Sequence, residues 1–282
     1  MRTPATSTKE ILDNEYLELE LLLEGIYRKY GFDFRDYSGV HIKRRLNHRL
    51  SASGLQNFTQ ILHRIIYDEE FFKQILLDLS INVTEMYRDP QFYLELRQKV
   101  VPYLSTYPFI KIWHAGCSAG QEVYSDAILL EEEGLLERVQ IYATDFNEKI
   151  LQKAKEGIYP VEEIRRYTEN YQKAGGTESF SDYYTAHYDS AMIKKSLRNN
   201  ILFSFHNLVT DGVFGEMNMV FCRNVLIYFN KDLQNRVLKL FHDSLIPGGF
   251  LCLGSKESLK FSDLEDRFEI ISAKEKIYRK KR

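Results

Sequence analysis

A glycine turn between two strand patterns carries the residues whose types and spacing best suit chemistry. The apolar run Ile110–His114 is followed by Gly116 and then by a helical pattern, and a second apolar run, Val139–Thr144, ends in Asp145. In such an α/β unit, an acid at the carboxyl end of the second strand can accept hydrogen bonds from both hydroxyls of a ribose. The pattern therefore predicts an adenosine pocket.

Two details of the turn decide between adenosine cofactors. A dinucleotide fold usually carries Gly-x-Gly-x-x-Gly, whereas this turn has only Gly116 and Gly120. The following helix starts with Glu122, whose carboxylate would repel a pyrophosphate from the positive end of the helix dipole. A cationic ligand without phosphate fits better. S-adenosylmethionine has an adenosine, a sulfonium and an ammonium group, and Gly116 would make room for it.

Two further polar clusters belong to the same predicted pocket. Arg223 and Asn224 directly follow an apolar strand pattern, at the strand end where open α/β sheets place their ligands. Thr84 and Arg88 lie four residues apart, so on a helix they would share one face. We expect both clusters to contribute to the cavity around the sulfonium.

The surrounding patterns predict a two-domain α/β protein. From Ile11 to about Arg97 the apolar residues recur at helical spacing, which indicates an all-helical N-terminal domain. From Ile110 onward strand and helix patterns alternate, as in a Rossmann-like, mostly parallel sheet. We predict a helical domain over 1–88, an α/β domain over 89–282 and a small antiparallel β insertion over 174–200. The predicted strands are Ile110–His114, Val139–Thr144, Ile201–His206, Met219–Cys222 and Gly249–Leu253.

Composition narrows the function classes. The 282 residues contain 38 Lys and Arg against 40 Asp and Glu, a net charge of −2, so no overall field favours nucleic acid. The three cysteines lack Cys-x-x-Cys spacing, which predicts a reducing, cytoplasmic location and no metal site. No apolar run is long enough to predict membrane insertion. We expect a monomer.

Two surface features have alternative interpretations. The segment Val40–Leu50 places Arg44, Arg45 and Arg49 on a short helix, either as a solvated face or as a docking patch for an acidic partner. In the insertion, the alternating run Tyr183–Tyr188 is either an ordinary hairpin or an edge strand that captures an extended peptide.

Several motifs, taken in chain order, resemble the CheR family of chemotaxis receptor glutamate methyltransferases, and the resemblance covers nearly the whole chain. The motifs are Thr84–Pro90, Gly116–Ser125, Ala143–Asp145, Asn207–Leu208, Phe221–Phe229 and Leu253–Leu259. Departures are Val123 for the usual Pro, Gln121 for the frequent Glu, and Ser255–Lys256 where His and Ser are common.

The resemblance implies transfer of a methyl group from S-adenosylmethionine to glutamate carboxylates of a chemoreceptor helical bundle, leaving S-adenosylhomocysteine. Arg88 and Tyr228 would act at the reacting groups, and a receptor tail peptide would bind the β insertion. A carboxylate is already ionised at neutral pH, so the reaction needs no general base, in keeping with the lack of a His among the candidate residues. The implied cofactor-binding residues are Asn82, Thr84, Arg88, Gly116, Glu122, Asp145, Asn207, Leu208, Arg223 and Asn224.

Two other functions compete with this hypothesis. A nucleic-acid methyltransferase would share the cofactor pocket, but base methylation typically uses an Asp/Asn-Pro-Pro-Tyr loop, where this chain reads Cys222–Val225. A non-catalytic module that senses the cofactor and binds receptors is favoured by the altered Ser255–Lys256 motif. The joint presence of Thr84, Arg88 and Asp145 opposes that alternative.

Overall fold

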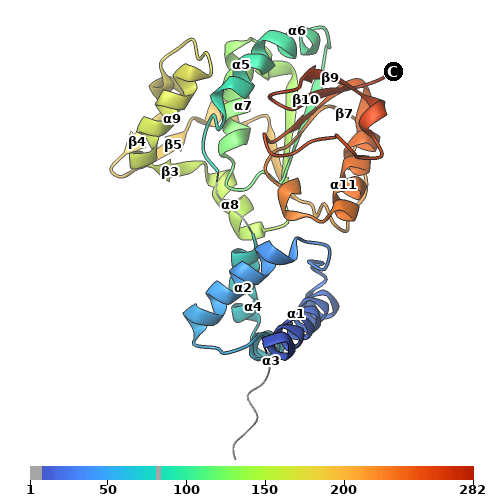
Figure 1. Ribbon diagram of the computed structural model, residues 1–282. Helices are drawn as coiled ribbons and strands as arrows, with labels where there is room; N and C mark the ends of the chain where they lie inside the picture. Colours follow the sequence, from blue (N-terminus) through green and yellow to red (C-terminus); the bar gives the residue numbers. More distant parts are fainter. Residues whose placement is uncertain (1–7, 81–83) are drawn as a thin grey trace, which may run out of the picture. The chain divides into compact units, whose positions relative to one another are not determined.

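A computed structural model describes residues 8–80 and 84–282. The described residues divide into a smaller unit, 8–80 with 228–233, and a larger unit, 84–227 with 234–282 (Figure 1). The run Thr84–Arg88, which the predicted boundary assigns to the helical domain, belongs to the larger unit. Within the described ranges, no helix combines the length and apolar composition that a membrane crossing requires.

The smaller unit is built from helices whose ends follow local signals. Asn57 accepts a hydrogen bond from the backbone of Gln60 and starts α3, and Asp68 does the same for Phe71 at the start of α4. Gly54, at φ 66°, ends α2 in the left-handed region. The helices are α1 (Thr8–Tyr30), α2 (Gly39–Ser53), α3 (Phe58–Tyr67) and α4 (Glu69–Leu79). Their shared core includes Leu22, Ile26, Leu46, Ile61, Ile65 and Ile75.

A segment from much later in the chain completes the helical unit. The backbone of Ser38 donates to the carbonyl of Tyr228 at 2.7 Å, and that of Asn230 donates to Asp36 at 2.8 Å. The rings of Tyr37 and Phe229 pack edge to face, with centroids 4.9 Å apart. Residues 228–233 are therefore structural members of this unit.

In the described part of the larger unit, seven strands form one sheet in the order β6-β2-β1-β7-β8-β10-β9. The pairs from β6 to β8 are parallel, and β10 pairs antiparallel with both β8 and β9. This mostly parallel sheet confirms the predicted fold class. The strands are β1 (Ile110–Ala115), β2 (Val139–Asp145), β6 (Ile201–Phe205), β7 (Met217–Cys222), β8 (Leu245–Leu253), β9 (Phe268–Ser272) and β10 (Ile277–Lys280).

Neighbouring residues of β1 show how helices cover the two faces of the sheet. The Trp113 ring packs on Phe241 of α11 (Lys231–Ser244), whereas the next residue, His114, faces Asp126 of α7 (Gln121–Glu132). Because successive side chains of a strand point to opposite faces, α7 and α11 lie on opposite sides of the sheet (Figure 1). The other helices of this unit are α5 (Pro90–Lys99), α6 (Val101–Leu104), α8 (Glu148–Glu156), α9 (Val161–Lys173) and α10 (Lys195–Arg198). Short 3-10 turns are η1 (Leu136–Arg138), η2 (Phe180–Tyr183), η3 (Leu226–Tyr228) and η4 (Glu265–Arg267).

A separate antiparallel sheet has the order β3-β5-β4. It pairs β5 (Ser190–Ile193) with β4 (Tyr184–His187) and with β3 (Ile158–Pro160). The predicted insertion over 174–200 therefore contains two of the three strands but misses β3. The three-residue β3 lies between two helices and is too short to give a strand period of its own.

Candidate active site

The ends of β1, β2 and β7 gather the predicted pocket at one edge of the sheet. In the parallel register, Ala115 of β1 lies beside Thr144 of β2, and His114 lies beside Phe221 of β7. The residues that follow these positions are the glycine turn Gly116–Gly120, Asp145 and Arg223. Because parallel strands end at the same edge, residues far apart in the sequence converge there.

The glycine turn is shaped by close backbone approach. Gly116 has φ 78°, and a Cβ there would lie 2.8 Å from the Val225 side chain. Gly120 has φ 88°, and a Cβ there would lie 3.1 Å from that of Ala154. The backbone N–H groups of Gly116 and Cys117 both donate to the Thr144 carbonyl at 2.8 Å. Glycine is needed at both positions to keep the turn close to the end of β2.

Asp145 is buried and held by the backbone on both of its oxygens. The Ser118 N–H donates to Oδ2 and the Asn147 N–H donates to Oδ1, each at 3.0 Å. Burial raises the pKa of Asp145 to about 6, although the hydrogen bonds from Asn147 and Ser118 oppose that rise. A carboxylate has about four acceptor sites on its two oxygens, so Asp145 can accept further hydrogen bonds from a ligand. Two fixed acceptors next to each other match the diol of a ribose.

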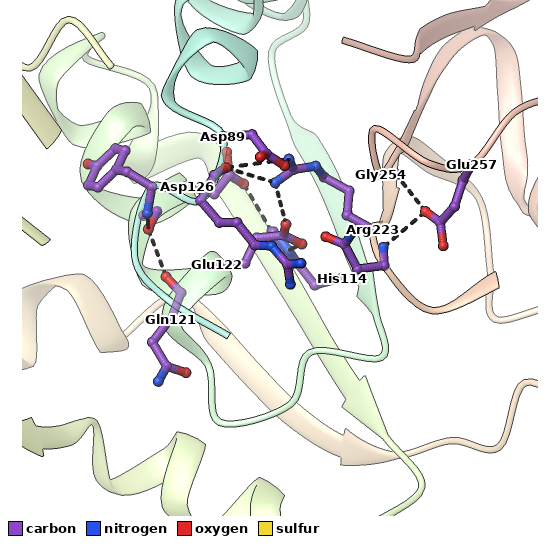
Figure 2. Close-up of polar contacts among 12 residues, drawn as sticks. Asp89, His114, Gln121, Glu122, Asp126, Arg223, Gly254 and Glu257 are labelled. Carbon is purple, nitrogen blue, oxygen red and sulfur yellow. Dashed lines mark hydrogen bonds and ion pairs between the residues drawn. The ribbon is translucent and has the colours of Figure 1, made fainter. Parts of the chain in front are cut away.

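Arg223 is the centre of a buried ionic cluster (Figure 2). Its guanidinium pairs with Glu122 at 2.9 Å and with Asp89 at 2.8 Å, and it stacks on the Phe92 ring 4.1 Å away. The side chain is 2% exposed. Asp89 has φ 59° at the start of α5, and its carboxylate pairs with Arg223 instead of capping the helix. The guanidinium thus joins the loop after β7 to α7 and to the start of α5.

His114 extends this cluster into the layer between β1 and α7. Its Nδ1 lies 3.4 Å from Glu122 and its Nε2 lies 3.2 Å from Asp126. Burial opposes the charged imidazole, but the two carboxylates prevail and raise the pKa of His114 to about 9. Burial also raises the pKa of its partner Asp126, so the pair shares one proton at neutral pH. His114 was not among the residues predicted for the site, and the structure places it beside Glu122, which was.

The cluster carries a net negative charge. Burial raises the pKa of Glu122, but His114 and Arg223 outweigh it, and the pKa lies below its usual value. Three carboxylates, of Glu122, Asp126 and Asp89, face two cations, so the sum is −1. That sum is the same whether the shared proton resides on His114 or on Asp126. The region favours a cationic ligand over an anionic one.

Glu257 joins the loops that follow β7 and β8. Its carboxylate accepts from the backbone N–H groups of Gly254 at 2.6 Å, Asn224 at 2.9 Å and Ile227 at 3.3 Å. A Cβ at Gly254 would lie 2.7 Å from the Asn224 nitrogen. Asn224 itself has φ 62°. These hydrogen bonds hold the loop that carries Arg223 to the loop after β8. They are formed although Ser255 and Lys256 stand where His and Ser are common.

These residues fit S-adenosylmethionine. Asp145 offers paired acceptors to a ribose, Gly116 and Gly120 leave space that a side chain would fill, and the charge of the Arg223 cluster suits a cation. Within the described part of the chain, the Ser118 hydroxyl oxygen is buried without a hydrogen-bond partner. It lies on the same turn and is available to a ligand.

Comparison with known families decides the identity of the fold. Residues 82–277 match the S-adenosylmethionine-binding domain of CheR methyltransferases, and residues 17–80 match the all-alpha domain of the same family. The chain belongs to the CheR family. The larger unit is thus an S-adenosylmethionine-binding methyltransferase domain, and the cofactor predicted from the sequence is confirmed.

Relatives extend over most of the chain. The chain is 54% identical to the "Putative methyltransferase Cher3" of Pseudomonas putida, over 95% of this chain and 98% of that protein. It is 30% identical to chemotaxis protein methyltransferase 1 of Pseudomonas aeruginosa, covering 82% and 85% of the two chains. It is 29% identical to the chemotaxis protein methyltransferase of Borreliella burgdorferi, covering 86% and 88%. The protein is therefore a methyltransferase of the CheR family.

The remaining predicted cofactor residues are placed in turns. Thr84 and Arg88 lie in the non-helical segment before α5, so the prediction that they share a helical face is wrong. The backbone of Tyr87 between them has φ 52°, outside the range of a right-handed helix. The Arg88 carbonyl accepts from Arg223 at 3.4 Å. Asn207 and Leu208 follow β6, where the Asn207 side chain accepts from the backbone of Val209. Asn82 lies outside the described residues.

Tyr228 belongs to the smaller unit. Its ring packs edge to face on His41, with centroids 5.3 Å apart, and its carbonyl accepts from Ser38. The placement of Tyr228 near the reacting methyl group stays a prediction.

The three arginines of the basic helix differ in their surroundings. Arg45 donates to the backbone carbonyl of Asp78 at 2.8 Å, and Arg49 pairs with the carboxylate of the same residue. Both side chains thus hold α2 to α4. Arg44 is exposed on α2. Of the predicted docking residues, Arg44 is the one that the fold leaves directed at solvent.

Sequence reasoning missed His114, Asp126, Asp89 and Glu257 as members of the site. Two signals were available. His114 is a polar residue that directly follows the apolar Ile112 and Trp113 of a strand pattern, and Asp126 follows Glu122 by one helical turn. Asp89 and Glu257 stand inside two of the motifs that carry the family resemblance, but their partners come from distant loops that only the fold brings near.

Proposed function

We propose that this protein transfers the methyl group of S-adenosylmethionine to glutamate side-chain carboxylates of chemoreceptor-type coiled-coil proteins in the cytoplasm. The products are glutamyl methyl esters and S-adenosylhomocysteine. The proposal accords with the relatives, which are named chemotaxis protein methyltransferases in Pseudomonas aeruginosa and Borreliella burgdorferi.

The contacts of His114 with Glu122 and Asp126 support the proposal about the acceptor. The imidazole is held between Glu122 and Asp126, so in its paired state it has no free lone pair to take a proton from an incoming nucleophile. An amine or hydroxyl acceptor needs such a base near neutral pH, whereas a glutamate, with a reference pKa of about 4.3, does not. The buried pair thus favours an acceptor that arrives ionised.

The contribution of the protein is then positioning. The bound cofactor supplies an activated methyl group. Asp145 and the Arg223 cluster would hold its two ends, and alignment of the carboxylate oxygen with the methyl group supplies about 7–11 kcal/mol in favourable cases. No proton has to move in the transfer step.

An assay for base-labile methyl groups tests this function. The full chain is incubated with methyl-labelled S-adenosylmethionine and the cytoplasmic fragment of a receptor from the same organism, and then with alkali. Release of volatile methanol is expected, because alkali hydrolyses methyl esters but not methylated amines. Stable label on nucleic acid or on amines, or no label above a sample without receptor, contradicts the proposal.

Arg88 gives a prediction at the reacting groups. We propose that its guanidinium pairs with a carboxylate, either that of the cofactor or that of the substrate. Arg88→Ala should lower methyl transfer at least about tenfold, the loss of one charge-assisted hydrogen bond, with the unfolding temperature unchanged. A raised Kd for S-adenosylmethionine by calorimetry assigns Arg88 to the cofactor, and a raised KM for the receptor assigns it to the substrate. Unaltered turnover removes Arg88 from the site.

We further propose that Arg44 docks the acidic receptor helices. Arg44→Glu should raise the KM for the receptor fragment about threefold to tenfold at low salt, with little change in cofactor affinity, because complementary charge steers encounter. Arg165→Glu is a matched control, since Arg165 is 91% exposed on α9 and the substitution changes the net charge equally. Equal effects of the two variants would show that only overall charge matters.

The proposed tail-peptide site is the outer edge of β4. This strand ends its three-stranded sheet, and Thr185, Ala186 and His187 are exposed. An extended peptide could pair with it through backbone hydrogen bonds. Backbone hydrogen exchange of the full chain would be measured with and without a receptor tail peptide. Exchange in β4 should slow when the peptide is present, and exchange in β3 should not change.

A further inference from the structure

His114 and Asp126 form a buried polar pair next to the cofactor site. Each side chain is 1% exposed, and the ring of His114 stacks on Phe221 with centroids 4.2 Å apart and planes 8° apart. A buried ion pair is weak evidence for stability, because the loss of hydration offsets much of the attraction. The location of this pair indicates a role in binding.

The pair acts on the site through one group, Glu122. Glu122 and Asp126 are four residues apart on α7 and share a face, and the imidazole bridges them (Figure 2). Arg223 holds the second oxygen of Glu122. The Glu122 side chain keeps 18% of its surface exposed, whereas His114 and Asp126 are sealed. Its carboxylate is therefore oriented from two sides while still reachable.

Asp126 is a second acid beside His114, and it allows the cluster to keep its negative charge. A carboxylate flanked by two cations, Arg223 and His114, would attract a cationic ligand only weakly. Asp126 balances the proton on His114, so that Glu122, Asp89 and Arg223 together retain a net charge of −1. The attraction for a positive ligand survives the presence of the imidazolium.

We propose that His114 and Asp126 are positioning residues that hold the Glu122 carboxylate and, by neutralising each other, strengthen the binding of S-adenosylmethionine relative to S-adenosylhomocysteine. The two ligands differ by the methyl group and the positive charge of the sulfonium. The inference rests on the proposed location of Glu122 near the cationic end of the cofactor.

Calorimetry on the full chain without receptor tests the inference independently of the acceptor. Asp126→Asn leaves the imidazole paired with Glu122 alone, so that His114 no longer holds and balances Glu122 as in the parent. The affinity for S-adenosylmethionine should fall about tenfold, and that for S-adenosylhomocysteine less than about threefold. The double variant His114→Gln with Asp126→Asn removes both charges. It should bring the ratio of the two affinities back to within about threefold of the parent. Tyr183→Phe is the control, because it removes a hydrogen bond of 3.0 Å to Glu132 at the far end of α7.

The outcomes separate positioning from simple packing. Equal losses for both ligands in Asp126→Asn, or no loss, overturn the inference. A double variant whose ratio stays as low as that of Asp126→Asn also overturns it. If the single variant does not fold, a double variant whose ratio lies more than about threefold below that of the unsubstituted protein overturns it. Failure of receptor methylation alone would refute the proposed acceptor and leave these binding results standing.

Discussion

Replacing Asp145 with Asn should weaken binding of S-adenosylmethionine about a hundredfold, equivalent to about 2.7 kcal/mol. Asp145 accepts backbone N–H groups on both oxygens, from Ser118 on Oδ2 and from Asn147 on Oδ1, so an amide NH2 would face a donor whichever way it turns. The substitution also removes the charge from hydrogen bonds to the ribose, which are worth about 1.5–3 kcal/mol each. Calorimetry with the full chain measures the change.

Glu132→Gln is the matched control for a buried acid. Glu132 is 1% exposed at the other end of α7, where it pairs with Arg97. We expect its loss to lower the unfolding temperature but to leave cofactor affinity within about twofold of the parent, since no buried charge near Asp145 changes. An Asp145→Asn variant that binds like this control would remove Asp145 from the ribose site.

The raised pKa of Asp145 predicts how binding depends on pH. The pKa of about 6 lies above the ordinary value for Asp, because burial penalises the carboxylate. Ribose hydroxyls donate to the ionised form, so cofactor affinity should fall as the pH decreases from about 7 to about 5. His114, with a pKa of about 9, stays protonated across that range. The contribution of Asp145 to folding has the opposite sign, since the folded state takes up its proton first and gains stability as the pH falls.

Arg223→Met should lower the free energy of unfolding by about 3–5 kcal/mol and remove methyl transfer. Its guanidinium is 2% exposed and pairs with both Glu122 and Asp89, and breaking a buried pair leaves an uncompensated charge. Loss of the Arg223 guanidinium also removes one of the two hydrogen-bond donors that hold Glu122. Denaturant unfolding and labelled-methyl transfer measure the two effects.

Arg279→Met is the matched control for Arg223. The Arg279 guanidinium also stacks on a ring, that of Tyr103 at 4.4 Å, but it donates to the backbone carbonyl of Gly248. We expect it to cost about 1 kcal/mol and to leave turnover intact. Adding Asp89→Asn to Arg223→Met should recover part of the stability, because one unpaired carboxylate is removed. Equal losses for the two Met variants would show that packing, not ion pairing, explains the role of Arg223.

Local sequence predicts the parallel sheet well and its other strands poorly. The predicted strand over Met219–Cys222 appears in β7, whose residues are all buried, so a continuous apolar run identifies it. The strands β9 and β10 escape prediction because they are short, and β9 also carries the exposed residues Glu269 and Ile270. Antiparallel strands at the sheet edge gain their pairing from β8, which no local period encodes.

For the site too, local sequence predicts single residues but not their contacts with distant segments. Asp145, Glu122 and Arg223 were predictable, because each stands at a strand end or in the first turn of a helix. The ionic partners of Arg223 were not, since Glu122 and Asp89 lie 101 and 134 residues away in the sequence. The surroundings of Arg45 and Arg49 were also not predictable. Both side chains contact Asp78 of α4, whereas the sequence of α2 alone indicates a uniformly basic helix.

Locating the transferred methyl group tests the central claim most directly. A receptor cytoplasmic fragment is incubated with the protein and S-adenosylmethionine, digested under acidic conditions that preserve esters, and sequenced by tandem mass spectrometry. We predict one added methyl group on glutamate side chains that recur at heptad spacing along the helices, and its loss at any position changed to alanine. Methyl groups on lysine or arginine, or an unmodified receptor with intact cofactor binding, would contradict the account.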